Sequence, residues 1–412
     1  MFKIYYHNDL RISDNICQET FESFRNKYEE TSGLLTNHYQ LRFEKHYQIE
    51  SDSSSERWRG RLIEPRIINF LKATGETCEQ IDTIIPDKDG VLVIYWPSIA
   101  NMTKDVLDQI FGKYTGHVLI DDTYETHLTR CVVTKEWLEQ LGYDLSNVTF
   151  WTNGPNKDNV IDFESKLIRQ NWLHLVHLYE TRNPIPEIKE TDELKYFKNK
   201  LKRFLYMNGH STAQREYVAG QITKQNDLGD FMYSFINPSD NYKDYFLMGN
   251  KDRKSFINRR LLNDVAGGAT AKDNFVNKEW WTYTYYYVNI ETNFHWRDHN
   301  ARMLTEKWMK PIMYLTPSFN IGDYPGLEEY TRLLGFEDYS QWLDKGYDNI
   351  DNWYERGKQF AQSISETERP SEADWYQMME AAEYNYHHFY NNYIPNLTKI
   401  FKNSLSKILD KS

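Results

Sequence analysis

The chain of 412 residues is poor in cysteine and has no long apolar run. Its three cysteines, Cys17, Cys78 and Cys131, are scattered without a C-x-x-C spacing, which is typical of reduced thiols that bind no metal. No stretch approaches the roughly 18 apolar residues that a membrane-spanning helix needs. The opening residues also lack the apolar core of a signal peptide. These absences predict a cytoplasmic protein with no membrane partner.

Common nucleotide and hydrolase motifs are missing as well. The chain contains no G-x-x-x-x-G-K-[ST] phosphate loop, no G-x-S-x-G turn and no G-x-G-x-x-G. Their absence argues against P-loop nucleotide hydrolases, serine esterases and Rossmann-type dehydrogenases.

Two sequence patterns resemble metal sites, but the residues around each of them do not fit one. His295 and His299 stand four apart, but the segment has no glutamate in the H-E-x-x-H position. Asp87-Lys88-Asp89 precedes an expected strand, where a solvated turn is the ordinary interpretation. We therefore expect no metal site.

The composition predicts a globular protein with two cores. The 412 residues exceed the roughly 250 to 300 at which single cores stop growing. Hydrophobic residues make up 40%, enough to fill two cores rather than leave the chain disordered. The net charge of -11 argues against diffuse binding to nucleic acid but leaves room for a local basic patch.

Strand-like and helix-like segments alternate along the first 180 residues, which predicts a parallel α/β sheet. The second half shows the same alternation, with strands expected at 203–208 and 284–290 and helices at 212–224 and 327–334. In the first half we expect strands at Phe2–Tyr6, Gly90–Tyr95, His117–Ile120 and Val148–Thr152, and helices at Lys104–Phe111 and Thr134–Leu141.

The segment 181–191 contains two prolines and several charges without apolar periodicity, so it predicts a domain boundary. The expected domains are 1–180 and 192–365, with C-terminal helices over 366–412. Those helices comprise an aromatic segment, Trp375–Tyr393, and a last amphipathic helix that Pro395 should separate from it. They either pack back on the body of the protein or cap the second domain.

Arg215 is the first candidate binding residue. Asn208-Gly209 reads as a turn after a short buried strand, and Thr212 as the N-cap of the next helix. Arg215 then falls in the first turn, where a cation opposes the helix dipole unless an anion lies between them. This placement predicts a phosphate site, whereas the alternative is a surface salt bridge with Glu216 or another neighbour.

A second cluster of charges follows an aromatic, strand-like run. Glu291 ends the run, and after a polar loop Thr305-Glu306-Lys307 opens a new element that closes on Lys310-Pro311. This order, over roughly residues 203–356, resembles the donor domain of GT-B glycosyltransferases. The pattern is closest to that of the alpha-1,3-fucosyltransferases and related phage glycosyltransferases. Pro311 departs from it, because the family's helix continues at that position.

The resemblance implies a fold and a donor site. The fold is two Rossmann-like domains that face a cleft, the first on the acceptor side and the second binding a nucleotide diphosphate sugar. Glu291 or Glu306 would bind ribose hydroxyls and Lys307 the diphosphate. The donor-binding residues are thus expected to be Asn208, Arg215, Glu291, Thr305, Glu306 and Lys307. Fixed cations replace a metal ion in such a site, so no cofactor is expected.

The sequence leaves several candidates for the acceptor and for the catalytic base. Arg57, Arg59 and Arg61 surround Trp58, as in a loop that contacts phosphate. Some of the enzymes that the chain resembles are phage enzymes, so the resemblance makes a hydroxymethylated pyrimidine in phage DNA a candidate acceptor, with a glycan as the alternative. A non-catalytic nucleotide-sugar-binding protein and a structural phage protein remain alternatives for the whole chain. The candidate bases, expected in the first domain, are His7, Asp121, Asp122 and Glu125.

Overall fold

The computed structural model of the protein is an α/β fold with two parallel sheets. Two compact units are present, one formed by residues 1–180 together with 399–412 and the other by 181–398. The structure describes residues 3–6, 68, 71–72, 75–81, 83–84, 90–95, 99, 102, 104–122, 128–153, 167–170, 192–208, 213–235, 278–291, 304–322 and 326–409.

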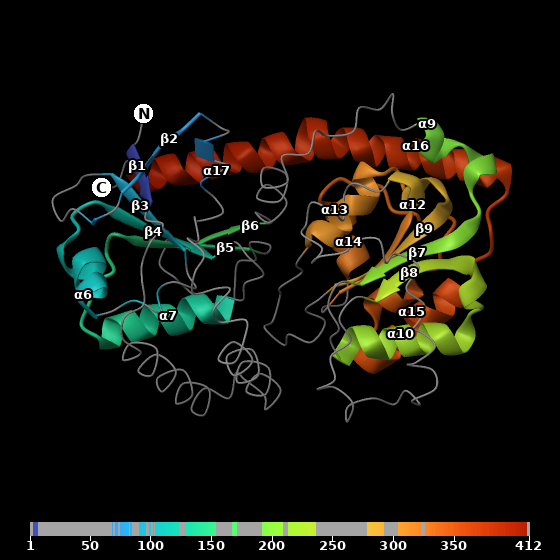
Figure 1. Cartoon of the computed structure of the whole chain (residues 1–412), viewed down its shortest axis with the longest axis horizontal. Coiled ribbons are helices and arrows are strands. Elements are labelled where there is room, and N and C mark those ends of the chain that lie inside the picture. The colour runs from blue at the N-terminus through green and yellow to red at the C-terminus, as the bar shows by residue number, and fades with distance from the viewer. Residues whose placement is uncertain are drawn as a thin grey trace. The chain divides into compact units, whose positions relative to one another are not determined.

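The first unit contains a six-stranded sheet in the order β2-β1-β3-β4-β5-β6, with each neighbouring pair parallel (Figure 1). The chain therefore starts inside the sheet, adds one strand on one side and then builds outward on the other. The strands are β1 Lys3–Tyr6, β2 Thr77–Gln80, β3 Val91–Tyr95, β4 His117–Asp122, β5 Val148–Asn153 and β6 Leu167–Gln170.

The two faces of this sheet are both covered, as its nearly continuous apolar strands require. One face, with Leu92, Val118 and Phe150, packs in a core with Trp137 and Leu138 of a helix. On β5 the next side chain, Trp151, stacks on Phe401 with ring centroids 3.9 Å apart. The helical elements of the unit are α6 Lys104–Leu107, the π-helical turn η2 Asp108–Lys113, α7 Leu128–Gln140 and residues 399–409 of α17 Ile394–Leu409.

The second unit contains a four-stranded parallel sheet in the order β10-β9-β7-β8. Every residue of β9 is buried, in keeping with its place inside the sheet and its aromatic sequence TYYYVNI. The strands are β7 Lys202–Asn208, β8 Phe231–Phe235, β9 Thr284–Ile290 and β10 Ser318–Ile321.

Helices cover both faces of the second sheet, with α10 and α15 together on one face and α12, α13 and α16 on the other (Figure 1). The elements of this unit are α9 Asp192–Lys195, η4 Phe197–Asn199, α10 Ala213–Gln225, η5 Leu228–Asp230, α12 Lys278–Thr282, α13 Glu306–Met313, α14 Leu327–Leu333, η8 Gly346–Asn349, α15 Trp353–Glu366, α16 Glu372–His388 and the π-helical turn η9 Phe389–Tyr393, followed by the start of α17.

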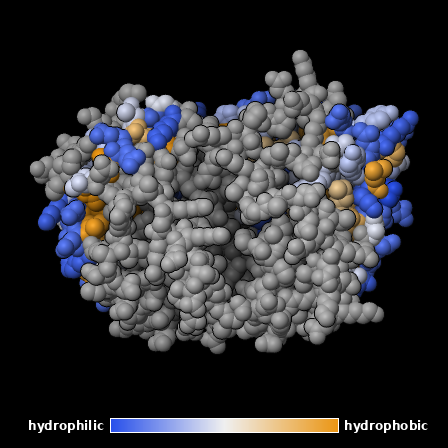
Figure 2. Space-filling model, viewed as in Figure 1, coloured by the Kyte–Doolittle hydropathy of each residue, from blue (hydrophilic) through white to orange (hydrophobic). Residues whose placement is uncertain are grey.

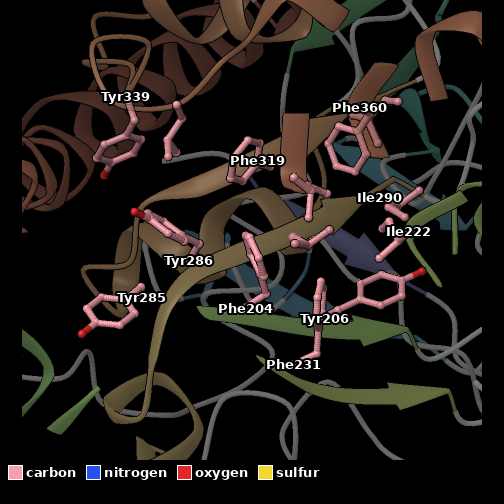
Figure 3. Close-up of a cluster of buried hydrophobic side chains, with 14 of the residues drawn as sticks. Phe204, Tyr206, Ile222, Phe231, Tyr285, Tyr286, Ile290, Phe319, Tyr339 and Phe360 are labelled. Atoms are coloured by element: carbon pink, nitrogen blue, oxygen red, sulfur yellow. The ribbon is translucent and has the colours of Figure 1, made fainter. Parts of the chain in front are cut away.

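Alternate aromatic side chains of β9 face opposite layers. Tyr286 packs with Phe319 of β10, which in turn meets Phe360 of α15 edge to face (Figure 3). Tyr285, next to it, packs against Trp375 of α16. The period of two therefore lets a single strand contact the layers on both sides of the sheet, and this explains why the consecutive positions Tyr285 to Tyr287 are all aromatic.

Two prolines behave differently from the expectation. The structure carries α13 through Pro311 to Met313 instead of ending it at Lys310, because Trp308, Met309 and Met313 are all buried and hold the turn helical. Pro395 does not separate the last two helices. It lies in the first turn of α17, where a proline is tolerated, and the chain before it widens into the π-helical turn η9.

Other boundaries agree to within a few residues, except that α7 begins at Leu128 rather than at Thr134. The described surface in the view of Figure 2 is mostly hydrophilic, with small apolar areas between the polar ones. Among the described helices, none combines the length and the apolar character that crossing a membrane requires.

Candidate functional site

The strand order of the second sheet identifies the edge where a ligand site is expected. From β7 the chain goes to β8 on one side and then to β9 on the other, so the order reverses between β7 and β9. In open parallel sheets, ligands bind outside the carboxyl ends of the strands at this kind of reversal. Here those ends are Asn208 on β7 and Ile290 on β9.

Arg215 lies at this edge. The helix α10 begins at Ala213, which places Arg215 in its first turn, as the sequence predicted. The side chain is only 2% exposed, and its Nε donates a hydrogen bond to the backbone carbonyl of Ile290 over 3.0 Å. Arg215 is therefore a buried cation rather than a surface one. Its position links the start of α10 to the end of β9.

Glu291, the residue after β9, is held by Thr305. The Thr305 hydroxyl donates to Glu291 Oε2 over 2.6 Å, and the Thr305 N–H donates to Oε1 over 3.4 Å. Both residues are buried, with 3% of Glu291 and 2% of Thr305 exposed. A hydrogen bond to a charged group contributes roughly 1.5 to 3 kcal/mol. The carboxylate is thus fixed in one orientation at the edge of the sheet.

Thr305 also connects Glu291 to Lys307. As the N-cap of α13, its Oγ1 accepts a hydrogen bond from the backbone N–H of Lys307 over 3.3 Å. The Lys307 Nζ donates to the same oxygen over 3.4 Å. A hydroxyl has one hydrogen and two lone pairs, so these three contacts use its full capacity. The predicted N-terminal position of Lys307 on this helix is therefore correct.

The structure thus brings Arg215, Glu291, Thr305 and Lys307 to one edge. Asn208 is the last residue of β7, beside β9, and Glu306 is the first residue of α13. The side chains of these two residues lie outside the described part of the structure.

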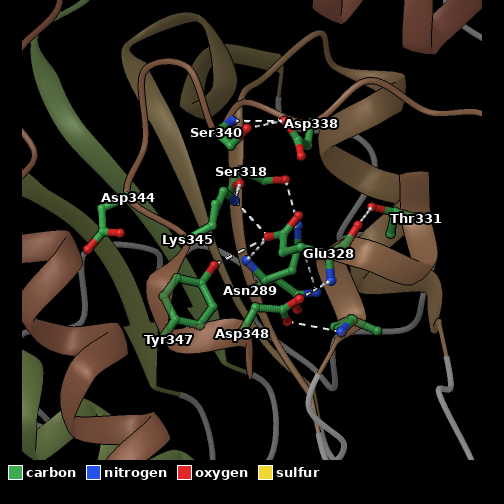
Figure 4. A network of polar contacts seen from close by, with 12 residues as sticks. Asn289, Ser318, Glu328, Thr331, Asp338, Ser340, Asp344, Lys345, Tyr347 and Asp348 are labelled. Carbon is green, nitrogen blue, oxygen red and sulfur yellow. Dashed lines mark hydrogen bonds and ion pairs between the residues drawn. The ribbon is translucent and has the colours of Figure 1, made fainter. Parts of the chain in front are cut away.

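A buried polar network continues from Glu291 into the sheet, and Figure 4 shows its part around Asn289, Glu328 and Lys345. Asn289 Nδ2 donates to Glu291 Oε1 and to Asn320 Oδ1, each over 3.2 Å. Asn320 faces Asn289 in the register of β9 and β10. From Asn320, Nδ2 donates to Glu328 Oε1 over 3.3 Å and to the hydroxyl oxygen of Ser318 over 3.0 Å. Glu291 is therefore one end of a connected set of polar side chains.

The other end of this network is a buried ion pair. Lys345 Nζ lies 2.6 Å from Glu328 Oε1, and both side chains are 8% exposed. The same oxygen accepts hydrogen bonds from the Asn320 backbone N–H over 3.1 Å and from the Tyr347 hydroxyl over 3.3 Å. A buried pair of this kind adds little net stability, but removing one partner is strongly destabilising.

Asp348 caps the helix that carries Glu328. Its carboxylate accepts hydrogen bonds from the backbone N–H groups of Leu327, Glu328 and Glu329 at the start of α14, over 2.9, 3.0 and 3.3 Å. Burial, and then the neighbouring charge of Glu328, raise the pKa of Asp348 to about 6. Two carboxylates therefore share this part of the core, and Lys345 is the cation beside them.

Sequence reasoning missed this network, although a signal was present. Each of two apolar strands carries one asparagine just before its last residue, in Val288-Asn289-Ile290 and in Phe319-Asn320-Ile321. Asparagine is depleted in strands, so two such positions suggest a paired role. The pairing itself depends on the strand register, which the sequence does not specify.

The candidate bases belong to the first unit. Asp121 is fully buried near the carboxyl end of β4, and Asp122 is the last residue of that strand, with a side chain outside the described part. The sheet order places β1, β3 and β4 side by side, so their carboxyl ends share one edge. His7 follows β1 in sequence. His7, Glu125, Arg57, Arg59 and Arg61 lie outside the described residues.

Among the described residues, no group of three or more His, Cys, Asp or Glu side chains could hold a metal ion. His295, His299 and Asp87 to Asp89 lie outside the described ranges. No model of a known protein family, no curated protein and no solved structure matches this chain.

Proposed function

We propose that this protein is a glycosyltransferase that binds a nucleotide diphosphate sugar in its second unit and transfers the sugar to an acceptor hydroxyl. The observation that carries the proposal is the convergence of Arg215, Glu291, Thr305 and Lys307 beside the reversal in strand order between β7 and β9. Two positive side chains and one oriented carboxylate are the groups that a diphosphate and a ribose require.

The roles follow from charge. Arg215 and Lys307 neutralise the charge that develops on the leaving diphosphate, and Glu291 or Glu306 accepts hydrogen bonds from the ribose. Lys307 is only half-buried, and we propose that its ammonium group reaches the ligand. Because these cations are fixed by the fold, we propose that transfer needs no metal ion and no cofactor.

We propose that the first unit has the role of the acceptor domain of a GT-B enzyme, with a base near the carboxyl edge of its sheet. Asp121, Asp122 and His7 are the candidates for that base. We propose a hydroxymethylated pyrimidine in phage DNA as the acceptor, contacted by Arg57, Arg59 and Arg61. The enzyme would then act in the cytoplasm of the host cell.

A panel of UDP-, GDP-, CMP- and dTDP-sugars tests the proposal. One of the UDP-, GDP- or dTDP-sugars should raise the melting temperature of the protein, whereas the CMP-sugars, which carry a single phosphate, should not. Incubation of that donor with hydroxymethylated DNA should yield glycosylated DNA. A Lys307→Ala variant should lose the shift, whereas Lys358→Ala, which removes an exposed lysine of α15, should keep it.

Each outcome of the panel separates the alternatives. Binding without transfer to DNA or to a glycan identifies a non-catalytic nucleotide-sugar-binding protein. Transfer to a glycan alone identifies a fucosyltransferase-like enzyme. If no nucleotide sugar changes the melting temperature, the proposal is wrong and a structural role gains support.

A further inference from the structure

Asn289 is a buried amide that connects the candidate site with the interior of the second sheet. Its side-chain nitrogen carries two hydrogens, and the two acceptors beside it are Glu291 Oε1 and Asn320 Oδ1, each at 3.2 Å. Its own Oδ1 is buried and has no hydrogen-bond partner among the described residues.

The orientation of this amide is imposed from the far end of the network. Glu328 Oε1 accepts hydrogen bonds from Lys345 Nζ and from the backbone N–H of Asn320. Asn320 must then direct its Nδ2 toward Glu328, which leaves Asn320 Oδ1 to face Asn289. Glu291, the other neighbour of Asn289, is also an acceptor when ionised. Both sides thus require the nitrogen of Asn289.

We infer that Asn289 is a positioning residue for Glu291, with the direction of its amide set by the ion pair of Glu328 and Lys345. This inference rests on the proposed function, in which Glu291 accepts hydrogen bonds from ribose hydroxyls. Thr305 holds the carboxylate from the side of α13, and Asn289 holds it from β9. Together they fix the plane of the carboxylate, and this sets the preference for a ligand that carries both ribose hydroxyls.

The test compares nucleotides that differ only in those hydroxyls. Calorimetry measures the binding of UDP and GDP and of the 2′,3′-dideoxy form of each to the parent protein and to Asn289→Leu. The parent should prefer the ribose form by about tenfold or more, and Asn289→Leu should lose most of this preference while still binding the dideoxy form. A merely structural defect would weaken both forms together.

Asn385→Leu is the matched control. Asn385 is a buried asparagine of the same unit that exchanges two hydrogen bonds with the backbone of Glu337, both over 2.8 Å, and it does not belong to the network around Glu291. This variant should lose stability and keep the preference for ribose. A second variant, Asn320→Ala, removes the acceptor that orients Asn289 and should reduce the preference by a smaller factor. It serves as the test if Asn289→Leu does not fold.

The outcomes separate the inference from the function on which it rests. If no nucleotide sugar of the panel binds the parent protein, the proposed function fails and the inference falls with it. If only a dTDP-sugar binds, the function stands and the inference is overturned, because the deoxyribose of dTDP lacks the 2′-hydroxyl. If UDP or GDP binds with a preference for ribose, and both network variants keep that preference in full, the function stands and the inference alone is overturned.

Discussion

The hydroxyl of Thr305 donates a hydrogen bond to Glu291 over 2.6 Å while the same oxygen caps α13 through the backbone N–H of Lys307. One side chain therefore ties the end of β9 to the start of the helix that presents Lys307. Movement of this helix start would disturb the carboxylate as well, so the two candidate ligand groups are mechanically coupled.

Replacement of Thr305 tests this coupling. Thr305→Val keeps the shape but removes both the cap and the donor to Glu291, so we expect a loss of about 1 to 3 kcal/mol in the free energy of unfolding. Urea denaturation measures the change. Thr305→Ser retains the hydroxyl and should recover most of the stability. Equal stability of the valine and serine variants would show that the hydroxyl contributes little.

Arg215→Ala and Lys307→Ala should each weaken donor binding by about tenfold or more, because each removes a positive charge from the proposed diphosphate site. They should differ in stability. Arg215 is buried and bonded to Ile290, so its loss also destabilises the fold, whereas Lys307 is only half-buried. Calorimetry with the cognate nucleotide sugar gives the first quantity and thermal melting the second. Two variants that bind as tightly as the parent would remove both residues from the donor site.

The raised pKa of Asp348 predicts that the free energy of unfolding depends on pH. Its pKa of about 6 in the folded protein lies above the value of about 3.9 expected for an unfolded chain. The folded state therefore binds more protons between these values, and this residue makes stability fall as the pH rises from about 4 to 6. The carboxyls of Asp108, Asp230 and Asp338 have lowered pKa values, so their contribution is lost only below about pH 4.

Asp348→Asn should flatten this slope and still offer an oxygen to the start of α14. The difference in unfolding free energy between parent and variant should change by on the order of 2 kcal/mol between pH 4.5 and 7. Urea denaturation at several pH values measures it. Parallel curves for the two proteins would show that Asp348 titrates as an ordinary exposed carboxyl.

The acceptor proposal predicts a salt-dependent interaction with DNA. If Arg57, Arg59 and Arg61 contact phosphates, binding of duplex DNA should weaken steeply with salt, and replacing all three by alanine should make the slope of log K against log salt shallower by about 2 to 3. Fluorescence anisotropy at several salt concentrations provides the slopes. An unchanged slope would remove this segment from the interface.

Transfer activity should survive exhaustive chelation by EDTA, since Arg215 and Lys307 supply the positive charge that a metal ion provides in other enzymes. Activity with the cognate donor before and after chelation is the measurement. Complete loss that manganese or magnesium restores would mean that the phosphate site lies on other residues.

The sequence predicts those parts of the fold that local chemistry determines. The bounds of β9 follow from a run of aromatic and β-branched residues, and the start of α13 follows from the capping threonine before an acid and a lysine. The sequence does not predict the boundaries of helices and strands that depend on tertiary packing. α13 continues through Pro311 because its side chains are buried, and β10 has only four residues, too few to show a period.

The candidate site likewise has parts that the sequence predicts and parts that it does not predict. The positions of Arg215 and Lys307 at helix starts could be predicted, because capping and turn residues mark those starts in the sequence. The partners of Glu291 could not be predicted in full. Asn289 and Asn320 are 31 positions apart, and only the register of two parallel strands brings their amides together.

The stacking of Trp151 on Phe401 bears on how the protein is made. The first unit takes its covering aromatic ring from a segment that leaves the ribosome only after the whole second unit has been synthesised. Domains usually fold from the N-terminal end as translation proceeds. Here Phe401 can reach Trp151 only after the second unit has been synthesised, so we expect the packing of the first unit to be completed after translation.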